Sequence, residues 1–276
     1  MNGKPGMALK YSISNIAWDK DHDAEMYLFL KENGIQGLEI APTRIFDDPY
    51  DNLERSHLYA RMLENRYSLK VSSMQSIWYR ITEKIFGTDA EREELIRYTK
   101  KAILFAESMS IGNMVFGCPK NRRIPDGMSE EEALKIAVPF FRELGDYARE
   151  HHTVIAMEAN PKIYGTNFLN GTREACEFVR RVGSTGLKVN IDMGTMIYNK
   201  ENPHLVKTYK TLVNHIHISF PNLLPIEECE EYRTLRKVLG KIDYSGYISV
   251  EMKNTGDIQA AKDAVIFVKE FFHGIP

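Results

Sequence analysis

The sequence predicts one (β/α)8 barrel domain spanning residues 1–276, and three observations support this fold class. Eight short apolar or alternating runs are each followed by an amphipathic run. The chain is long enough for such a barrel, which commonly needs about 250 residues, and no linker rich in Gly, Pro or Ser divides it. The same alternation could form a doubly wound open sheet. The count of eight units, with no GxGxxG turn after the first predicted strand, favours the closed barrel.

The predicted strands are short runs that are either mainly apolar or alternate between polar and apolar residues. They span residues 10–18, 35–42, 70–78, 112–119, 153–161, 187–194, 213–220 and 246–253. Pro42 ends the second strand and Pro161 the fifth, because proline lacks the N–H that a strand ladder uses. The residues before the first strand, 1–8, are predicted to be a loose leader.

The predicted helices lie between these strands and carry typical start and stop signals. They span residues 21–33, 52–67, 89–108, 129–151, 172–182, 202–212, 226–239 and 258–272. Gly34 stops the first helix, Thr88 is the expected N-cap of the third, and Ser129 and Glu132 have capping-box spacing in the fourth. Thr172 is expected to cap the fifth. Several aromatic residues near the C-terminus could form subunit contacts, so a homodimer or a homotetramer is compatible with the sequence.

Composition narrows the function classes. The formal net charge is -2 and the pI is about 6.5, so no global charge signal indicates a nucleic acid or membrane partner. No apolar run reaches the length of a signal peptide core or a membrane span. The three cysteines lie far apart and fit reduced thiols, which predicts a cytoplasmic protein.

Four predicted strands each carry one metal-binding type of residue near the C-terminal end: Glu158, Asp192, His217 and Glu251. Strand alternation places the last three on the polar face, opposite the apolar face that suits packing against helices. Active sites of (β/α)8 barrels lie at the C-terminal strand ends. Taken singly, each Glu or Asp could instead form a structural ion pair, and the His could instead be hydrogen-bonded without a metal. Together they predict a site for one divalent metal ion, Mn²⁺ first, with Mg²⁺, Co²⁺ or Zn²⁺ as alternatives.

The runs "MEANP", "IDMG", "HIHIS" and "GYISVEMK" resemble the strand ends of the xylose isomerase-like TIM barrel family. This is the sugar phosphate isomerase/epimerase group, which includes tagatose and psicose 3-epimerases. The resemblance covers nearly the whole chain and is most specific in its second half. It implies metal ligands at Glu158, Asp192, His217 and Glu251, and an acid/base pair formed by Glu158 and Glu251. The chain departs from the family at Thr195, where a histidine is frequent, and in lacking an arginine at residues 219–223.

The function implied is that of a sugar or sugar-derivative isomerase/epimerase. One glutamate removes a proton beside a carbonyl, a metal-stabilised enediolate forms, and the other glutamate returns the proton on the opposite face. A metal-dependent keto-sugar or inosose-type dehydratase or lyase on the same barrel is the alternative. An endonuclease-IV-like DNA repair enzyme and a non-catalytic sugar-binding barrel are weaker alternatives.

Six further residues are expected to contact the sugar: Trp18, Gln75, Lys120, Asn160, His215 and Lys253. Each has another interpretation. Trp18 and Trp78 also fit packing at the barrel rim, and the polar side chains also fit bonds to nearby loops. The run 120–123 predicts either an anion clamp or a solvated loop. Glu39, near the end of the second strand, is interpreted as a substrate contact or as the partner of a lysine.

Overall fold

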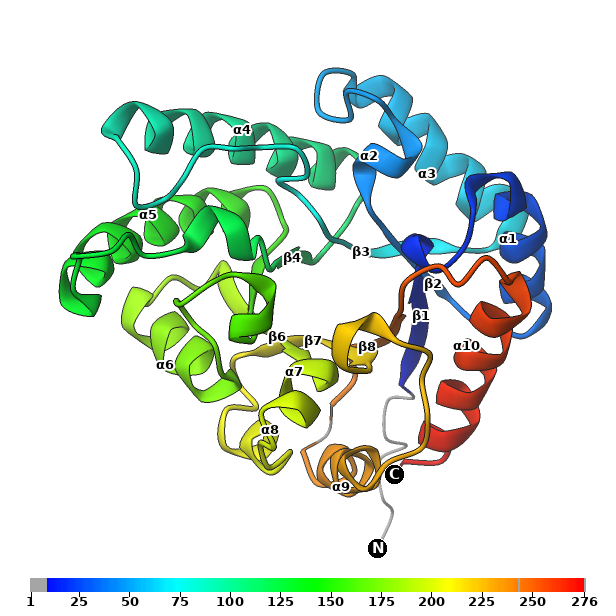
Figure 1. The fold of residues 1–276 in the computed structure, drawn as a ribbon. Coiled ribbons are helices and arrows are strands. Elements are labelled where there is room, and N and C mark those ends of the chain that lie inside the picture. The colour runs from blue at the N-terminus through cyan, green and yellow to red at the C-terminus, as the bar shows by residue number, and fades with distance from the viewer. Residues whose placement is uncertain (1–8, 243, 276) are drawn as a thin grey trace, which may run out of the picture.

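The computed structural model describes residues 9–242 and 244–275, in which eight parallel strands close into a barrel in chain order (Figure 1). The strands are β1 (Lys10–Ser14), β2 (Gly37–Ile40), β3 (Lys70–Met74), β4 (Met114–Phe116), β5 (Ile155–Glu158), β6 (Leu187–Asp192), β7 (Val213–Ser219) and β8 (Tyr247–Glu251). Strand β8 pairs with β1, from Lys10 opposite Tyr247 to Ile13 opposite Val250. The predicted (β/α)8 barrel is therefore confirmed. The leader predicted at residues 1–8 lies outside the described residues.

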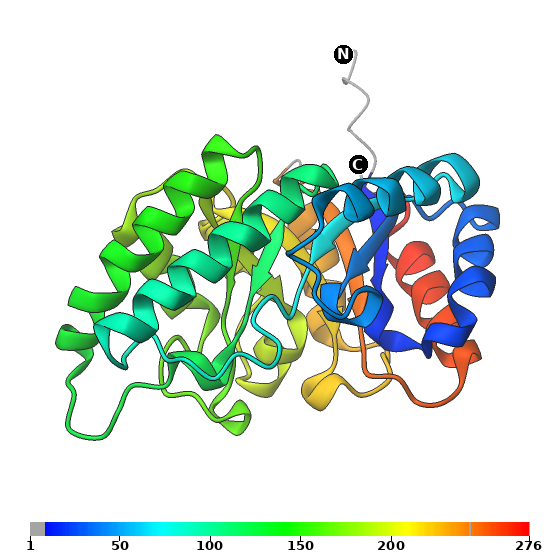
Figure 2. The same cartoon turned by 90° about the horizontal axis from the view of Figure 1, so that it is seen from above.

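Helices surround the strands on the outside of the barrel, as Figures 1 and 2 show. They are α1 (Asp23–Glu32), α2 (Pro42–Ile45), α3 (Leu53–Tyr67), α4 (Asp89–Ser108), α5 (Glu130–Glu150), α6 (Thr172–Val182), α7 (Met193–Tyr198), α8 (Leu205–Thr208), α9 (Glu230–Leu239) and α10 (Ile258–Phe272). Five 3-10 helices lie on loops: η1 (Asn15–Ala17), η2 (Lys20–His22), η3 (Pro119–Arg122), η4 (Lys162–Tyr164) and η5 (Pro221–Leu223). No helix in the described ranges is both long and apolar enough to cross a membrane.

Local signals explain most of the helix starts. The capping boxes of α4, at Thr88, and of α5, at Ser129 with Glu132, are present as predicted. The N-cap of α6 is Gly171 rather than Thr172, which is already the first helical residue. The prediction of a helix over residues 202–212 is wrong in length, since the short α8 is the helix that forms there. A helix missed by the sequence, α7, begins directly after β6 because Asp192 caps it.

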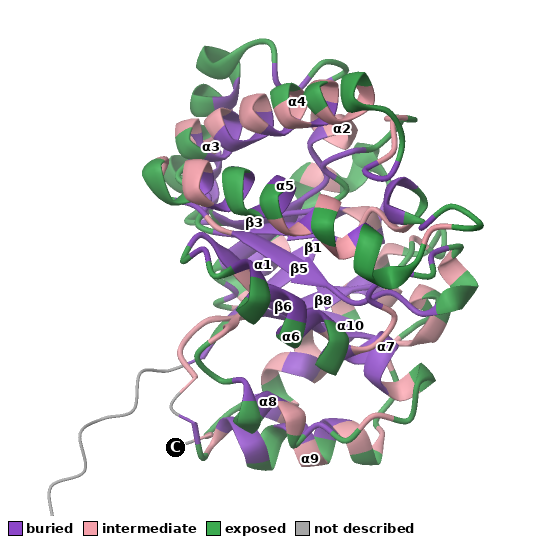
Figure 3. Cartoon of the chain, turned by 90° about the vertical axis from the view of Figure 1, so that its left-hand side faces the viewer, coloured by how far each residue is buried: buried purple, intermediate pink, exposed green. Residues whose placement is uncertain are grey.

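The two faces of the strands have different partners. The apolar faces, with residues such as Ile13, Met157, Ile191 and Val250, join the buried core beneath the helices. Figure 3 shows this arrangement as buried strands inside a ring of helices whose outer sides are exposed. The strand alternation used to predict the site therefore leaves the polar residues of β6, β7 and β8 for the barrel interior.

Polar side chains also fill the deeper part of the barrel. The hydroxyls of Ser12 on β1 and Ser72 on β3 lie 2.6 Å apart, although β2 separates these strands in the sheet. Gly37 on β2 makes room for this contact, because a Cβ atom added there would lie 2.9 Å from the Ser12 Cβ. A polar interior of this kind can hold further hydrogen-bonding and charged groups near the strand ends.

The closest backbone approach on the outside of the barrel occurs at Gly186, just before β6. A Cβ added to this buried residue would lie 1.9 Å from the carbonyl oxygen of Gly145 on α5. We expect Gly186→Ala to lower the free energy of unfolding by about 3 kcal/mol, because α5 must move away. Gly112→Ala is the matched control, since nothing lies within 4 Å of its added Cβ. Urea denaturation of both variants measures this, and equal stability would contradict the prediction.

Candidate active site

Two carboxylates converge at the C-terminal ends of the strands on one nitrogen of the His217 imidazole. Its Nδ1 atom lies 3.3 Å from Glu158 Oε2 and 3.2 Å from Glu251 Oε2. Strand register explains the meeting, since Ser219 pairs with Glu251 on β8 and Asp192 pairs with His217 from β6. All of these side chains except Asp192 are buried by residue exposure, and Asp192 is half-buried.

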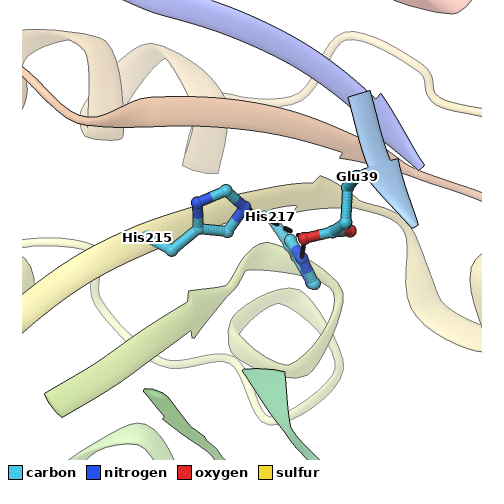
Figure 4. Close-up of side chains that lie close together, drawn as sticks. All are labelled: Glu39, His215 and His217. Atoms are coloured by element: carbon cyan, nitrogen blue, oxygen red, sulfur yellow. Dashed lines mark hydrogen bonds and ion pairs between the residues drawn. The ribbon is translucent and has the colours of Figure 1, made fainter. Parts of the chain in front are cut away.

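The other nitrogen of His217 faces a carboxylate that the sequence did not pair with it. His217 Nε2 lies 3.0 Å from Glu39 Oε2, and His215 Nε2 lies 3.1 Å from the same oxygen. Figure 4 shows both imidazoles turned toward Glu39, which comes from β2. The partner of Glu39 is thus a histidine pair rather than a lysine. His215, a predicted sugar contact, is 1% exposed and faces Glu39.

Asp192 lies beside this cluster but is held by its own neighbours. Its Oδ2 accepts hydrogen bonds from the N–H and the hydroxyl of Thr195, at 2.8 and 2.6 Å, and its Oδ1 accepts one from the Ser219 hydroxyl. In the described ranges, two groups of potential ligands have their ligand atoms within 4.8 Å of one another: Glu158, His217 and Glu251, and Glu39, His215 and His217. Three of the four predicted ligands are therefore brought together, with Asp192 on the adjacent strand.

Burial and mutual charge shape the site. Burial by itself lowers the pKa of His217, but Glu39, Glu251 and Glu158 outweigh it and raise that pKa well above the ordinary value. Burial opposes ionisation of Glu158, yet the hydrogen bond and charge of His217 hold its pKa below the ordinary value. Burial, opposed by His217, raises the pKa of Glu251 to about 7. Burial and the charge of Glu158 raise the pKa of Asp192. These carboxylates thus favour the protonated form of His217.

Glu158 is fixed by amides and by a buried arginine. Asn160 Nδ2 donates to Glu158 Oε1 at 2.9 Å, and Asn190 Nδ2 donates to Glu158 Oε2 at 2.7 Å. Arg122 Nη2 donates to the Glu158 carbonyl and to Asn160 Oδ1, each at 2.8 Å. Arg122 is fully buried, so it is neither an anion clamp nor a solvated loop residue. Its position in a polar run of four residues gave no signal of that burial.

The remaining predicted sugar contacts lie apart from the cluster. Trp18 is 2% exposed, and its indole N–H donates to Asp23 Oδ1 at 2.9 Å. Trp78 is similarly buried and donates to Thr99. Gln75 donates to the Ser14 hydroxyl, while Lys120 and Lys253 are exposed loop residues. Among the six predicted contacts, Asn160 joins the carboxylate cluster through Glu158, and His215 joins it through Glu39.

Tyr164 is a site residue that the sequence did not indicate. It follows β5 on η4, and its hydroxyl accepts a hydrogen bond of 3.1 Å from the N–H of Asn222 on η5. Burial raises the pKa of Tyr164, and the charges of Asp192, Glu251 and Glu158 raise it further. The hydrogen bond of Tyr164 therefore joins the loop after β5 to the loop after β7. The signal in the sequence was only a tyrosine four residues after Asn160.

Left-handed backbone conformations occur on several loops that follow the strands. Ser76 follows β3, Cys118 follows β4, and Asn222 and Leu223 follow β7, each with φ between 42° and 61°. Such conformations are costly for residues other than glycine and are often found at functional sites. The closely packed Gly117 also lies here, where an added Cβ would be 3.1 Å from Glu158 Oε1. These loops hold the site in a defined shape.

The chain belongs to the xylose isomerase-like TIM barrel family, whose model matches residues 28–271. This confirms the resemblance seen in the sequence. No curated protein sequence matches the chain.

Solved structures of similar fold include D-psicose 3-epimerase with D-tagatose from Clostridium cellulolyticum H10. It has a TM-score of 0.80 and 14% identity, covering 97% of this chain and 99% of that one. The 3-keto-D-glucoside 4-epimerase from E. coli has a TM-score of 0.77 and 16% identity, covering 95% and 100%. The IOLI protein with a zinc atom has a TM-score of 0.73 and 16% identity, covering 97% and 98%. At these identities the likeness shows the shared fold.

We expect Arg122→Met to lower the free energy of unfolding by about 3 kcal/mol, because it leaves the Glu158 carbonyl and Asn160 Oδ1 buried without their donor. The neighbouring Arg123 has a 54% exposed side chain, so Arg123→Met is the matched control and should change stability by about 0.5 kcal/mol at most. Urea denaturation compares the two variants. Equal losses would show that the buried bonds of Arg122 do not stabilise the site.

We expect Mn²⁺ to raise the melting temperature more at about pH 8 than at about pH 5.5. Glu251 has a pKa of about 7 against an ordinary 4.5, so the metal-free folded state keeps a proton that the unfolded state has lost. Its stability therefore falls as the pH rises through this interval, and the raised pKa of His217 acts in the same direction. Metal ligands must be deprotonated, so binding strengthens over the same interval. Thermal melts with and without Mn²⁺ test this, and a shift independent of pH would contradict it.

Proposed function

We propose that the protein is a divalent-metal-dependent isomerase or epimerase of a sugar or sugar derivative. The observation that carries this proposal is the meeting of two carboxylates, Glu158 from β5 and Glu251 from β8, at the same nitrogen of His217. Two acid/base groups from different strands can act on opposite faces of one carbon atom. Membership of the xylose isomerase-like TIM barrel family agrees with this chemistry.

The donor set fits a hard divalent cation. Glu158, Glu251 and His217 through Nδ1 would hold it, with Asp192 from the neighbouring strand as the fourth ligand. Buried carboxylates so close together are costly unless a positive charge compensates them, and in the metal-free site His217 supplies that charge. Three carboxylates and one imidazole favour Mn²⁺, with Mg²⁺, Co²⁺ and Zn²⁺ as alternatives. When bound, the cation acts as a Lewis acid on the carbonyl and hydroxyl oxygens of the sugar.

The two glutamates have environments that separate their roles. Glu158, with a lowered pKa, is ionised near neutral pH and can take the proton from the carbon beside a carbonyl. Burial raises the pKa of Glu251 to about 7 in the protein without metal. In the proposed reaction Glu251 is the group that exchanges a proton on the opposite face. Delivery to the same carbon gives epimerisation, and delivery to the neighbouring carbon gives aldose–ketose isomerisation. The reverse reaction exchanges the roles.

The groups around Glu158 prepare it for this step. Asn160 and Asn190 each donate to one of its carboxylate oxygens, which holds the ionised group in a fixed orientation. Asn160 was expected to bind a sugar hydroxyl, and its Nδ2 already donates a hydrogen bond to Glu158. The Tyr164 hydroxyl accepts from Asn222, so its own O–H remains available to a sugar hydroxyl.

The setting we propose is cytoplasmic, with a small-molecule sugar as partner. Three free cysteines, of which Cys176 is buried, fit a reducing compartment. A nucleic acid partner is not part of the proposal, because three-metal repair chemistry needs further histidine ligands. In the part of the chain that the structure describes, the two ligand groups contain His215 and His217 as their histidines.

A panel of ketoses and aldoses in D₂O tests the proposal on the Mn²⁺-loaded protein. We expect deuterium at one carbon beside the carbonyl and a product of otherwise unchanged mass. Glu158→Gln and Glu251→Gln should each slow the exchange by about 100-fold or more, because the amide cannot carry the proton. Glu150→Gln, an exposed residue at the end of α5, is the control and should retain the full rate.

Three results would contradict the proposal. A product lighter by one water would assign a dehydratase, and binding of a sugar without deuterium exchange would assign a non-catalytic barrel. Full exchange in both Gln variants with metal bound would remove the two glutamates from the mechanism.

A further inference from the structure

Glu39 is a fully buried carboxylate that the proposed reaction does not use. It lies on β2, and its contact with His217 on β7 joins residues 178 positions apart. These strands are not neighbours in the sheet, so the contact crosses the interior of the barrel. A charged group at 0% exposure is costly to bury unless it has a defined partner.

We propose that Glu39 is a positioning residue that fixes which nitrogen of His217 is free to bind the metal. This inference rests on the proposed function, because it assumes a cation held by Glu158, Glu251 and His217. Glu39 would act through the imidazole and would not touch the substrate.

The two nitrogens of His217 face different groups. Nε2 lies 3.0 Å from Glu39 with hydrogen-bond geometry, while Nδ1 faces Glu158 and Glu251 at 3.3 and 3.2 Å. A neutral imidazole carries one N–H and one lone pair, and the nitrogen with the lone pair is the one that binds a metal. With a cation bound at Nδ1 beside Glu158 and Glu251, the ring would keep its N–H at Nε2, where Glu39 accepts it.

Removal of Glu39 would reverse this preference. An N–H at Nε2 would then be a buried donor without a partner, which is unfavourable. The same proton at Nδ1 would find two carboxylate acceptors, Glu158 and Glu251, within 3.3 Å. Without Glu39, the neutral ring would thus favour its one proton on Nδ1, the atom that must bind the cation. Carboxylates that hold the second nitrogen of a ligating histidine commonly contribute 10–100-fold in metal affinity.

The same three residues could instead hold a second cation, since Glu39, His215 and His217 form a compact buried group (Figure 4). The hydrogen-bond geometry between Nε2 and Glu39 favours the first interpretation. A second cation at Nε2 would need both nitrogens of His217 as lone-pair donors, and hence a ring without any proton. His215 Nε2, at 3.1 Å from Glu39, lacks hydrogen-bond geometry.

Calorimetric titration of the metal-free protein with Mn²⁺ tests the proposal. We expect one equivalent per chain in the wild type, a loss of about 10- to 100-fold in affinity for Glu39→Ala, and a smaller loss for Glu39→Gln. The glutamine keeps the shape and a carbonyl acceptor for the Nε2 proton. Ser72→Ala is the matched control, because it removes another buried hydrogen bond inside the barrel, 2.6 Å long, and should leave the affinity unchanged.

A second readout separates positioning from mere stability. In Zn²⁺-loaded protein with ¹⁵N-labelled histidine, we expect the His217 proton on Nε2 and none on Nδ1. A proton on Nδ1, or two Mn²⁺ per chain, would overturn the proposal. Unchanged affinity in both Glu39 variants would do the same while the proposed function stands. If the wild type does not bind Mn²⁺, the result would contradict both the proposed function and this inference.

Discussion

The structure depends on one electrostatic constraint, the concentration of carboxylates around a single imidazole inside a closed barrel. Glu39, Glu158 and Glu251 all lie within 3.3 Å of a ring nitrogen of His217. Without a compensating charge this arrangement would not stay buried. The imidazolium provides that charge in the protein alone, and a divalent cation can replace it. The barrel interior is also polar away from this cluster, as the hydrogen bond between Ser12 and Ser72 shows. Buried polar groups there need hydrogen-bonding partners, just as the buried carboxylates need a compensating charge.

Strand periodicity made the fold and the carboxylate cluster predictable. Alternation in β6, β7 and β8 assigns a face to each residue, and parallel strands end at one edge, so no knowledge of the loops was needed. The other site residues depend on contacts that periodicity does not encode. Arg122 is buried by bonds to the Glu158 carbonyl and Asn160, and the Glu39–His217 contact spans the barrel. Helix α7 was missed because its N-cap is Asp192, which also ends a strand.

The departure from the family pattern at Thr195 has a structural meaning. Its N–H and hydroxyl both bond Asp192, and the hydroxyl also lies 3.0 Å from the Ala159 carbonyl. Thr195 therefore links the Asp192 side chain to the loop after β5. Its short side chain does not extend as far as the histidine that is frequent at this position would. Further along the same side of the barrel, Tyr164 and Asn222 join the loops after β5 and β7.

Closure of the barrel by β1 and β8 also determines when the site can exist. Its members come from the second, fifth, sixth, seventh and eighth strands of the described barrel. A nascent chain on the ribosome would present Glu39 and Glu158 long before their partners are synthesised. The carboxylates would then remain hydrated until β7 and β8 join the sheet. The buried cluster is therefore a property of the closed barrel.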